Sequence, residues 1–294
     1  MAFPGVTATD RVLAVDIGGT KFAASIVDRR GMTYWEQRVA TPARGGAEEL
    51  WSALVGLLSR RPSDPLVSAV GVGCGGPMSR EGELVSPLNI PGWRDFPMKR
   101  RLRDLTGLPV WVDNDAKALA LAEGWLGSAA GETDYISMVV STGVGGGIVL
   151  NGRLLEGNSG NAGHVGHVIV EPDGRPCRCG GRGCLEAEAS GTAIADITGR
   201  PAAEAGPDVV ERAGRLVGRA IADVANLLDL KLATVSGSVA LGFGEPFFSS
   251  AQREVDERCR LDFSRGCRVI RSDLGAVGPL IGAAAVGWRG SAGG

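Results

Sequence analysis

The sequence lacks several features that would assign it to particular classes of protein. Its formal net charge of −2 over 294 residues offers no basic face for general nucleic-acid binding. No apolar run approaches the about 18 to 20 residues of a membrane span, and the nearest, residues 279–288, is short and broken by glycine. The first ten residues lack a basic region followed by an apolar core, so no signal peptide is expected. These absences predict a soluble cytoplasmic protein without a membrane or nucleic-acid partner.

Two common nucleotide-binding signatures are also missing. The Walker pattern Gly-x-x-x-x-Gly-Lys-Ser/Thr does not occur. Gly71, Gly73 and Gly76 have the spacing of a dinucleotide fingerprint, but Pro77 follows where that fingerprint must open a helix. The sequence therefore predicts no NAD site at these glycines.

What the chain does have is enough apolar material, 44% of its residues, for the core of one large or two medium domains. Apolar residues at helical spacing predict helices at residues 47–60, 116–126, 208–230 and 278–288. Apolar runs rich in β-branched residues predict strands at residues 11–16, 22–27, 33–40, 66–73, 109–113, 135–141, 148–150, 234–235 and 268–271.

One plan occurs twice along the chain. VDIGGTKFAASIVD near the start and VSTGVGGGIVLNG in the middle both read as an apolar strand, a polar glycine-rich turn and a second apolar strand. A duplicated unit of this kind predicts two related α/β halves that face a cleft. We expect an N-terminal domain at residues 1–113 and a C-terminal domain at 114–275, with a closing helix at about 276–294 that packs on the first.

The first candidate site is the turn at residues 16–21 (DIGGTK). Glycines allow the backbone to approach an anion, and the exposed N–H groups of such a turn can form an anion-binding nest. Thr20 could donate a further hydrogen bond, and Asp16 could hold a hydrated Mg²⁺ near phosphates. From these six residues alone, an ordinary hairpin turn is an equal alternative. The second glycine-rich turn, at residues 142–147, raises the same possibility.

A second candidate is the run Asp113, Asn114 and Asp115, directly ahead of the helix expected at 116–126. Asp and Asn are favoured helix caps, which would explain one of the three residues. We interpret Asp115 as a general base that the positive helix end keeps ionised. Asn114 could then fix a substrate hydroxyl group.

A third candidate is a metal site. His167, Cys177, Cys179 and Cys184 lie within 18 residues of one another, separated by glycine-rich turns. In a reducing compartment clustered cysteines are read as metal ligands before disulfides. Three thiolates and one imidazole complete a tetrahedral Zn²⁺ shell and leave no open position, so the zinc would be structural.

Together these motifs resemble the ROK family of bacterial sugar kinases and repressors over nearly the whole chain from about Val12 onward. The resemblance rests on DIGGTK at 16–21, VDNDAKALALAE at 112–123, STGVGGG at 141–147 and GHVGHVIVEPDGRPCRCGGRGCLE at 163–186. It implies an α/β, actin/hexokinase-like (ribonuclease H-like) fold, in which duplicated domains surround a central cleft and carry a zinc-stapled loop. It also implies ATP and Mg²⁺ as cofactors, phosphoryl transfer to the 6-hydroxyl of a hexose, and a homodimer or homotetramer.

The resemblance assigns a role to each matching position. Asp115 is implied as the base that accepts the proton of the attacking hydroxyl, and His167 as both a zinc ligand and a sugar ligand. The other implied sugar-binding residues are Gly75, Gly76, Asn114, His164 and Glu186. The implied nucleotide-binding residues are Gly18, Gly19, Thr20, Lys21, Thr142, Gly143 and Gly237, with Asp16 near Mg²⁺.

His164 departs from the family pattern, in which most sugar kinases carry Glu three residues before the zinc histidine. Histidine can donate as well as accept a hydrogen bond. The resulting Gly-His-x-Gly-His resembles bacterial N-acetylmannosamine kinases, so the expected substrate is N-acetylmannosamine, with glucose or mannose as the alternative. The open alternative is that His164 packs near the zinc loop without contacting substrate.

Two noncatalytic readings compete with a kinase. A repressor of the same family would carry an N-terminal DNA-binding domain, but only about ten residues precede the first expected strand. A zinc-stapled sugar-binding protein would need neither glycine turn nor Asp115. The sequence therefore favours an ATP-dependent hexose kinase.

Overall fold

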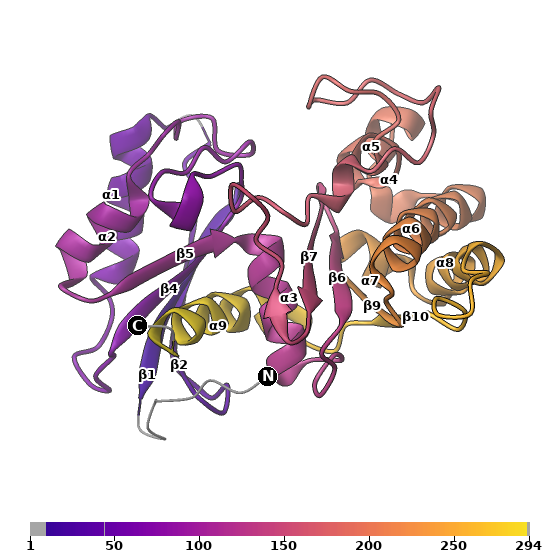
Figure 1. Cartoon of the computed structure of the whole chain (residues 1–294). Coiled ribbons are helices and arrows are strands. Elements are labelled where there is room, and N and C mark those ends of the chain that lie inside the picture. The colour runs from indigo at the N-terminus through magenta and orange to yellow at the C-terminus, as the bar shows by residue number, and fades with distance from the viewer. Residues whose placement is uncertain (1–9, 44, 293–294) are drawn as a thin grey trace. The chain divides into compact units, whose positions relative to one another are not determined.

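The computed structural model describes residues 10–43 and 45–292. The chain forms two compact units. Unit 1 comprises Met1–Leu126, Glu156–Ala162 and Ala276–Gly294, and unit 2 comprises Gly127–Leu155 and Gly163–Gly275. Each unit contains one five-stranded sheet among the described residues, and Figure 1 labels its strands and helices.

The sheet of unit 1 has the strand order β3-β2-β1-β4-β5. Its strands are β1 (Arg11–Ile17), β2 (Lys21–Asp28), β3 (Thr33–Ala40), β4 (Ala69–Cys74) and β5 (Val110–Asn114). The first three pair antiparallel, and β1, β4 and β5 run parallel. β1, β2 and β4 are almost entirely buried, as their near-continuous apolar sequences require.

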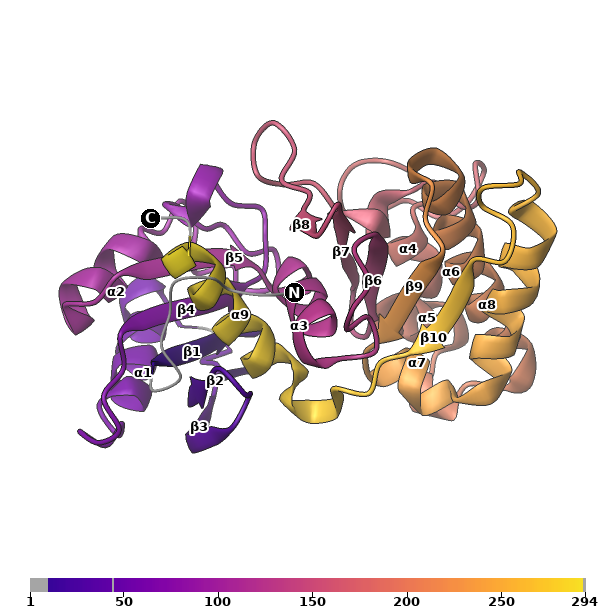
Figure 2. The same ribbon diagram turned by 60° about the horizontal axis from the view of Figure 1, so that its bottom comes forward.

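Helices cover both faces of this sheet. α1 (Ala47–Leu58) and α2 (Met98–Thr106) pack on one face, where they share a core with apolar residues of all five strands, those of β3 being only partly buried. α9 (Gly278–Ala292) packs against β1, β4 and β5 on the other, together with α3 (Asp115–Leu126). Figure 2 shows α9 and the pair α1 and α2 on opposite sides of the strands.

The sheet of unit 2 has the order β10-β9-β6-β7-β8. Its strands are β6 (Tyr135–Val140), β7 (Val144–Leu150), β8 (Arg153–Leu154), β9 (Leu232–Ser236) and β10 (Arg268–Arg271). The long helix α6 (Pro207–Leu228) packs against α8 (Glu245–Arg258), and both contribute to the apolar core that lies on this sheet. The apolar stripe predicted for residues 208–230 is confirmed along most of the helix, where Val210, Ala213, Val217 and Ala220 are buried, but not at its end, where Leu227 is 79% exposed.

The two sheets have the same topology. Read from β8, the second sheet runs β8-β7-β6-β9-β10, which repeats the order β3-β2-β1-β4-β5 of the first. Each begins with an antiparallel hairpin and continues with two parallel strands. The duplicated α/β fold predicted from the two glycine-turn motifs is therefore confirmed.

Two features differ from the sequence-based expectation. Residues 115–126 form α3, which packs against α9 and β4, so they belong to unit 1, as does the segment 156–162, although the expected C-terminal domain was 114–275. The glycine run at 143–147 is mostly strand, since β7 begins at Val144 and its glycines pair with β6. The turn itself shortens to residues 141–143.

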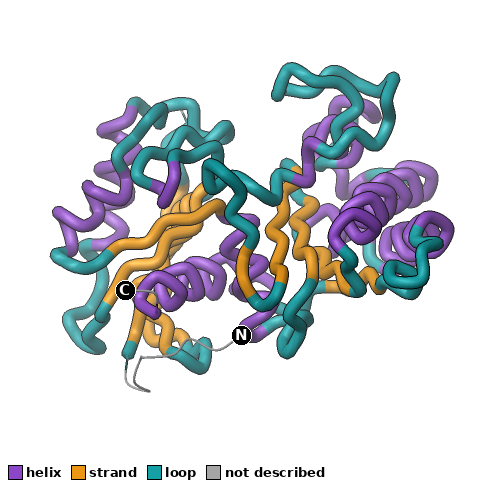
Figure 3. Tube along the Cα trace, in the orientation of Figure 1, coloured by secondary structure: helices purple, strands orange, loops and turns teal. Residues whose placement is uncertain are grey.

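The remaining elements are short. They are the helices α4 (Leu185–Ala189), α5 (Gly191–Thr198) and α7 (Ser238–Phe243), and the 3₁₀ turns η1 (Arg80–Gly82), η2 (Val165–His167), η3 (Ala202–Glu204) and η4 (Gly275–Val277). Figure 3 shows how much of the chain between β8 and α4 is loop. None of the helices in the described part of the chain is both long and apolar enough to cross a membrane.

Candidate functional site

In unit 1 the candidate residues gather where the parallel strands end. Asp16 pairs in register with Gly73 of β4, which pairs in turn with Asp113 of β5. Because parallel strands end at one edge of a sheet, the turn after β1, the loop after β4 and the start of α3 meet there. A Cβ atom on Gly73 would lie 3.6 Å from the Cβ of Ala118 and 3.7 Å from the Cα of Asp115, which are ordinary packing distances, so the start of α3 lies directly beside the end of β4.

The DIGGTK turn closes the hairpin between β1 and β2. The Gly18 N–H donates to the Lys21 carbonyl at 3.0 Å. Thr41 braces the turn from the end of β3, since its hydroxyl donates to the Gly18 carbonyl at 2.7 Å and its N–H to the Thr20 carbonyl at 3.0 Å. This is the hairpin that the sequence allowed, and its rigid backbone is also what an anion-binding turn requires.

Asp16 carries a carboxyl group with a strongly raised pKa at this edge. Its burial, reinforced by the negative charge of Asp115, raises its pKa to about 7, while Lys21 and Arg38 oppose the shift. A buried carboxylate beside a second carboxylate is stabilised by a bound cation. The pair therefore fits the Mg²⁺ that the sequence places beside Asp16.

Asp16→Asn should stabilise the ligand-free protein at high pH. The folded pKa lies above the unfolded one, so the wild-type protein loses stability as the pH rises from about 4 to 7. At about 1.4 kcal/mol per pKa unit, the loss approaches about 4 kcal/mol above pH 7. Urea unfolding at pH 4 and 8 should show the variant's advantage growing with pH. Asp104→Asn, at an exposed carboxyl of α2, is the control, and an equal advantage at both pH values would contradict the assignment.

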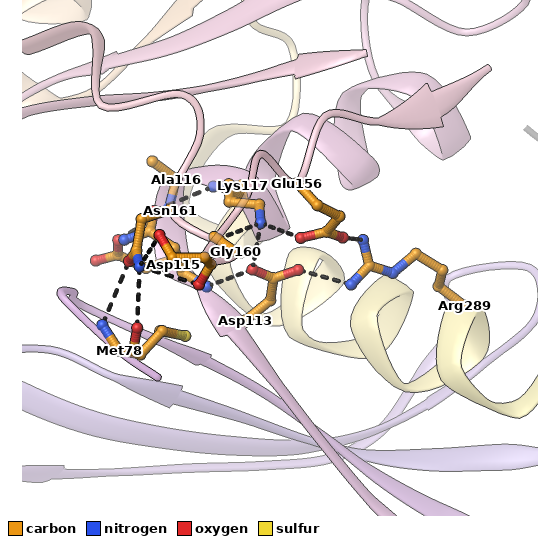
Figure 4. A network of polar contacts seen from close by, with 11 residues as sticks. Met78, Asp113, Asp115, Ala116, Lys117, Glu156, Gly160, Asn161 and Arg289 are labelled. Atoms are coloured by element: carbon orange, nitrogen blue, oxygen red, sulfur yellow. Dashed lines mark hydrogen bonds and ion pairs between the residues drawn. The ribbon is translucent and has the colours of Figure 1, made fainter. Parts of the chain in front are cut away.

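The three polar residues at the start of α3 have different roles. The Oδ1 atom of Asn114 accepts the N–H groups of Ala116 at 3.0 Å and Lys117 at 3.3 Å, so Asn114 is the helix cap. Capping uses its oxygen, so a substrate would meet its amide N–H groups. Asp115 is the first helical residue, where the positive end of the helix favours a carboxylate. Asp113 instead makes a buried ion pair with Lys117 and a partly buried one with Arg289 (Figure 4).

In unit 2 the second glycine turn is fixed by Glu186 of α4. The Oε2 atom of Glu186 accepts the Val144 N–H at 2.9 Å, and a Cβ on Gly143 would lie 2.7 Å from the same atom. A side chain at position 143 would therefore displace that carboxylate. Thr192 of α5 also holds the turn, because its hydroxyl donates to the Thr142 carbonyl at 2.9 Å. Glu186, a predicted sugar ligand, is thus directly bonded to the predicted phosphate turn.

Gly237 lies at the same edge of the second sheet. It follows β9, has a φ of 98°, and abuts the carbonyl of Val140 at the end of β6 so closely that no side chain fits. The structure therefore brings Thr142, Gly143 and Gly237, all predicted as nucleotide-binding, to one strand edge of unit 2.

The four predicted zinc ligands converge. One ligand atom from each of His167, Cys177, Cys179 and Cys184 lies within 4.8 Å of all the others. The His167 Nδ1 to Cys177 Sγ distance and the Cys179 Sγ to Cys184 Sγ distance are both 3.7 Å. A tetrahedral zinc with Zn–S bonds of about 2.3 Å requires sulfur atoms about 3.8 Å apart. The cluster fits Zn²⁺ with little rearrangement.

The zinc loop lies next to the predicted sugar ligands in the chain. Cys184 is the residue from which α4 starts, and Glu186 follows in the first turn of that helix. His164, which is exposed, has its ring 6.3 Å from that of His167 and nearly parallel to it. The metal would therefore fix the backbone that carries both histidines and Glu186.

Sequence reasoning missed Asn89. Its carbonyl oxygen lies 2.9 Å from where a Cβ of Gly19 would be, and its side-chain oxygen lies 3.1 Å from the corresponding point at Gly75. Asn89 therefore packs between the DIGGTK turn and the Gly75-Gly76 loop. It stands in a loop without periodicity, and only the close approach of two distant glycines reveals it.

The comparisons with known proteins agree with this geometry. The ROK family model matches residues 12–288. N-acetylmannosamine kinase from Yersinia pseudotuberculosis is 39% identical over 253 residues, covering 79% of this chain and 84% of that protein. The chain belongs to the ROK family, which confirms the resemblance drawn from its motifs.

Solved structures of the family share the fold. The ROK hexokinase from Thermus thermophilus is 34% identical and superposes with a TM-score of 0.84 over 97% of this chain and 100% of that one. The ROK glucokinase from Streptomyces griseus, in complex with glucose and AMPPNP, is 31% identical with a TM-score of 0.81 over 94% of this chain and 99% of that one. The expected hexokinase-like architecture is thereby confirmed.

Proposed function

We propose that this ROK sugar kinase transfers the γ-phosphoryl group of ATP to the 6-hydroxyl of N-acetylmannosamine. The observation that carries the kinase reaction is the pairing of Asn114 and Asp115 at the start of α3. The first is locked as a cap with its amide N–H groups available, and the second is a carboxylate at a helix N-terminus. Such a pair can orient a sugar hydroxyl and accept its proton.

The remaining residues have supporting roles. Asp115 takes the proton of the 6-hydroxyl as that oxygen attacks, and Asn114 orients a neighbouring hydroxyl. The backbone N–H groups of Gly19 and Thr20 and of Thr142 and Gly143 receive phosphate oxygens. Asp16 would hold the Mg²⁺, which would supply positive charge to the phosphoryl group. His167 and Glu186, fixed by the zinc loop, bind other sugar hydroxyls together with Gly75 and Gly76.

The choice of sugar rests on two observations. Curated relatives at 39% identity are N-acetylmannosamine kinases. Within the chain, His164 replaces the Glu of most family sugar kinases, and an exposed imidazole can donate to an acetamido oxygen where a carboxylate can only accept. The glucokinase from Streptomyces griseus keeps glucose as the second candidate.

A coupled ADP-release assay across N-acetylmannosamine, N-acetylglucosamine, glucose and mannose tests the substrate. We expect kcat/KM for N-acetylmannosamine to exceed that for glucose by at least about tenfold, the value of one well-placed hydrogen bond. His164→Glu should shift that ratio toward glucose, whereas His164→Gln, which can still donate, should shift it less. Robust turnover of glucose with none of N-acetylmannosamine would reject this assignment.

We further propose, from the family resemblance, that the enzyme acts in the cytoplasm as a homodimer or homotetramer. Analytical ultracentrifugation at micromolar concentration measures the assembly directly. Incubating the enzyme with sugar and polyphosphate in place of ATP, and measuring the sugar phosphate that forms, tests whether ATP is the only donor.

A further inference from the structure

Four charged side chains form a closed ring beside the start of α3 (Figure 4). Lys117 Nζ lies 3.1 Å from Asp113 Oδ1 and 2.6 Å from Glu156 Oε2. Arg289 lies 2.7 Å from Glu156 Oε1 and 2.7 Å from Asp113 Oδ2. Each carboxylate thus uses one oxygen for Lys117 and the other for Arg289, and the charges alternate around the ring.

The ring is buried on one side. The side chains of Lys117 and Asp113 are 1% and 5% exposed, whereas those of Arg289 and Glu156 are 35% and 48% exposed. A third acceptor, the Gly160 carbonyl at 2.9 Å, completes the hydrogen bonds of the Lys117 ammonium. Buried ion pairs gain little net stability because desolvation offsets their attraction, and their better-attested effect is to fix one geometry. The function of the ring therefore lies in the residues that it positions.

The ring positions the backbone around the predicted base, Asp115. Asp113 and Lys117 flank Asp115 by two residues on either side. The same Asp113 Oδ1 that meets Lys117 accepts the Asn114 N–H at 2.8 Å. The Lys117 N–H donates to the Asn114 side chain. The ring therefore fixes the backbone on both sides of Asp115 and the orientation of Asn114.

It also anchors the segment 156–162, which belongs to unit 1 although the chain on either side of it belongs to unit 2. The segment closes on itself through the Ala162 N–H and the Glu156 carbonyl, 3.0 Å apart. Its other anchor is Asn161, whose amide nitrogen donates to the Met78 carbonyl at 3.0 Å and whose oxygen accepts the Met78 N–H at 3.4 Å. Met78 lies two residues beyond Gly76, a predicted sugar ligand.

We propose that Lys117 is a positioning residue, which through the ring and the segment 156–162 joins the Asn114-Asp115 turn to the Gly75–Met78 loop as one rigid sugar-binding wall of unit 1. The assignment rests on the proposed function, because both joined parts are predicted sugar ligands. The link consists of two carboxylates, two cations, one carbonyl and the Asn161 amide, none of which is itself a predicted ligand.

The decisive variant removes the charges in a balanced way. Lys117→Met alone leaves Asp113 with Arg289 as its remaining cation in the ring, and we expect the protein to lose stability for that reason. The double variant Asp113→Asn with Lys117→Met removes one negative and one positive charge, so its unfolding midpoint should return toward wild type. We expect kcat of the double variant to remain at least about tenfold low, because a base misplaced by a fraction of an ångström loses its near-attack geometry. KM for ATP should change by less than about twofold.

A second measurement does not depend on kinase activity. Hydrogen exchange of the double variant should quicken in residues 156–162 and in residues 76–79 together, since both lose a shared anchor. Lys231→Met, which removes an exposed lysine of unit 2 that donates to the Arg265 carbonyl, is the control and should change neither segment. Faster exchange confined to the start of α3, or full kcat in the stable double variant, would overturn the proposal. A wild-type protein inactive on every hexose would instead reject the proposed function. The hydrogen-exchange result would still test whether Lys117 joins the two segments.

Discussion

Asp115→Asn is expected to leave the fold intact and to lower kcat at least about 10²-fold, the lower end of what a well-placed general base contributes. The amide keeps the size of the carboxylate and can still accept the Ala116 N–H, which Asp115 Oδ1 now accepts at 2.8 Å. It cannot take a proton from the sugar hydroxyl. Steady-state kinetics with N-acetylmannosamine and ATP, beside a thermal unfolding curve, measure both halves of the expectation.

The control for this variant is a carboxylate in the same local setting. Asp208 lies exposed in the first turn of α6, another helix N-terminus, so Asp208→Asn makes the same change at a place without predicted ligands. We expect it to retain full kcat. Turnover of Asp115→Asn within a few-fold of wild type would remove Asp115 from the role of base and leave it a charge near Mg²⁺ only.

The fold could be predicted where its signals are local. The hairpin of β1 and β2 and the hairpin of β6 and β7 follow from apolar strands around a glycine turn, and α6 follows from one apolar stripe. The unit boundary could not be read in this way. α3 joins unit 1 through its contacts with α9, whose residues follow more than 150 positions later in the chain. Nothing in the local pattern encodes that partner.

The candidate site shows the same division. The zinc ligands stand within 18 residues of one another, and spacing alone brings them together. The sequence predicted a helix cap and a base within the run Asp113 to Asp115, but it did not predict the ion-pair partners of Asp113. Asp113 and Arg289 are separated by 176 residues, and Lys117 reaches Gly160 across 43. Such long-range ion pairs and hydrogen bonds depend on how distant segments of the chain pack, and only the structure reveals them.

Loss of the zinc should be the other large effect. Cys177→Ser is expected to reduce the metal content from about one equivalent to less than half, because serine is a poor fourth ligand beside two thiolates and an imidazole. Structural zinc stabilises small loops by on the order of 10 kcal/mol, so the segment 167–184, which has no strand or helix of its own beyond the end of η2, should lose its order. Elemental analysis of the freshly purified variant and wild type measures the first step.

The consequence for catalysis follows from where that loop ends. Cys184 is the N-cap of the helix that carries Glu186, and Glu186 accepts the Val144 N–H beside the turn at Gly143. Disorder in the loop should therefore displace His167, Glu186 and the predicted phosphate turn. We expect kcat/KM to fall at least about 100-fold, as for other losses of positioning. Cys259→Ser, at a buried thiol of unit 2 outside the cluster, should keep both metal and activity. Wild-type protein with less than about half an equivalent of zinc, or a metal-free variant with full turnover, would show that His167 and Glu186 are held by the protein fold without the metal.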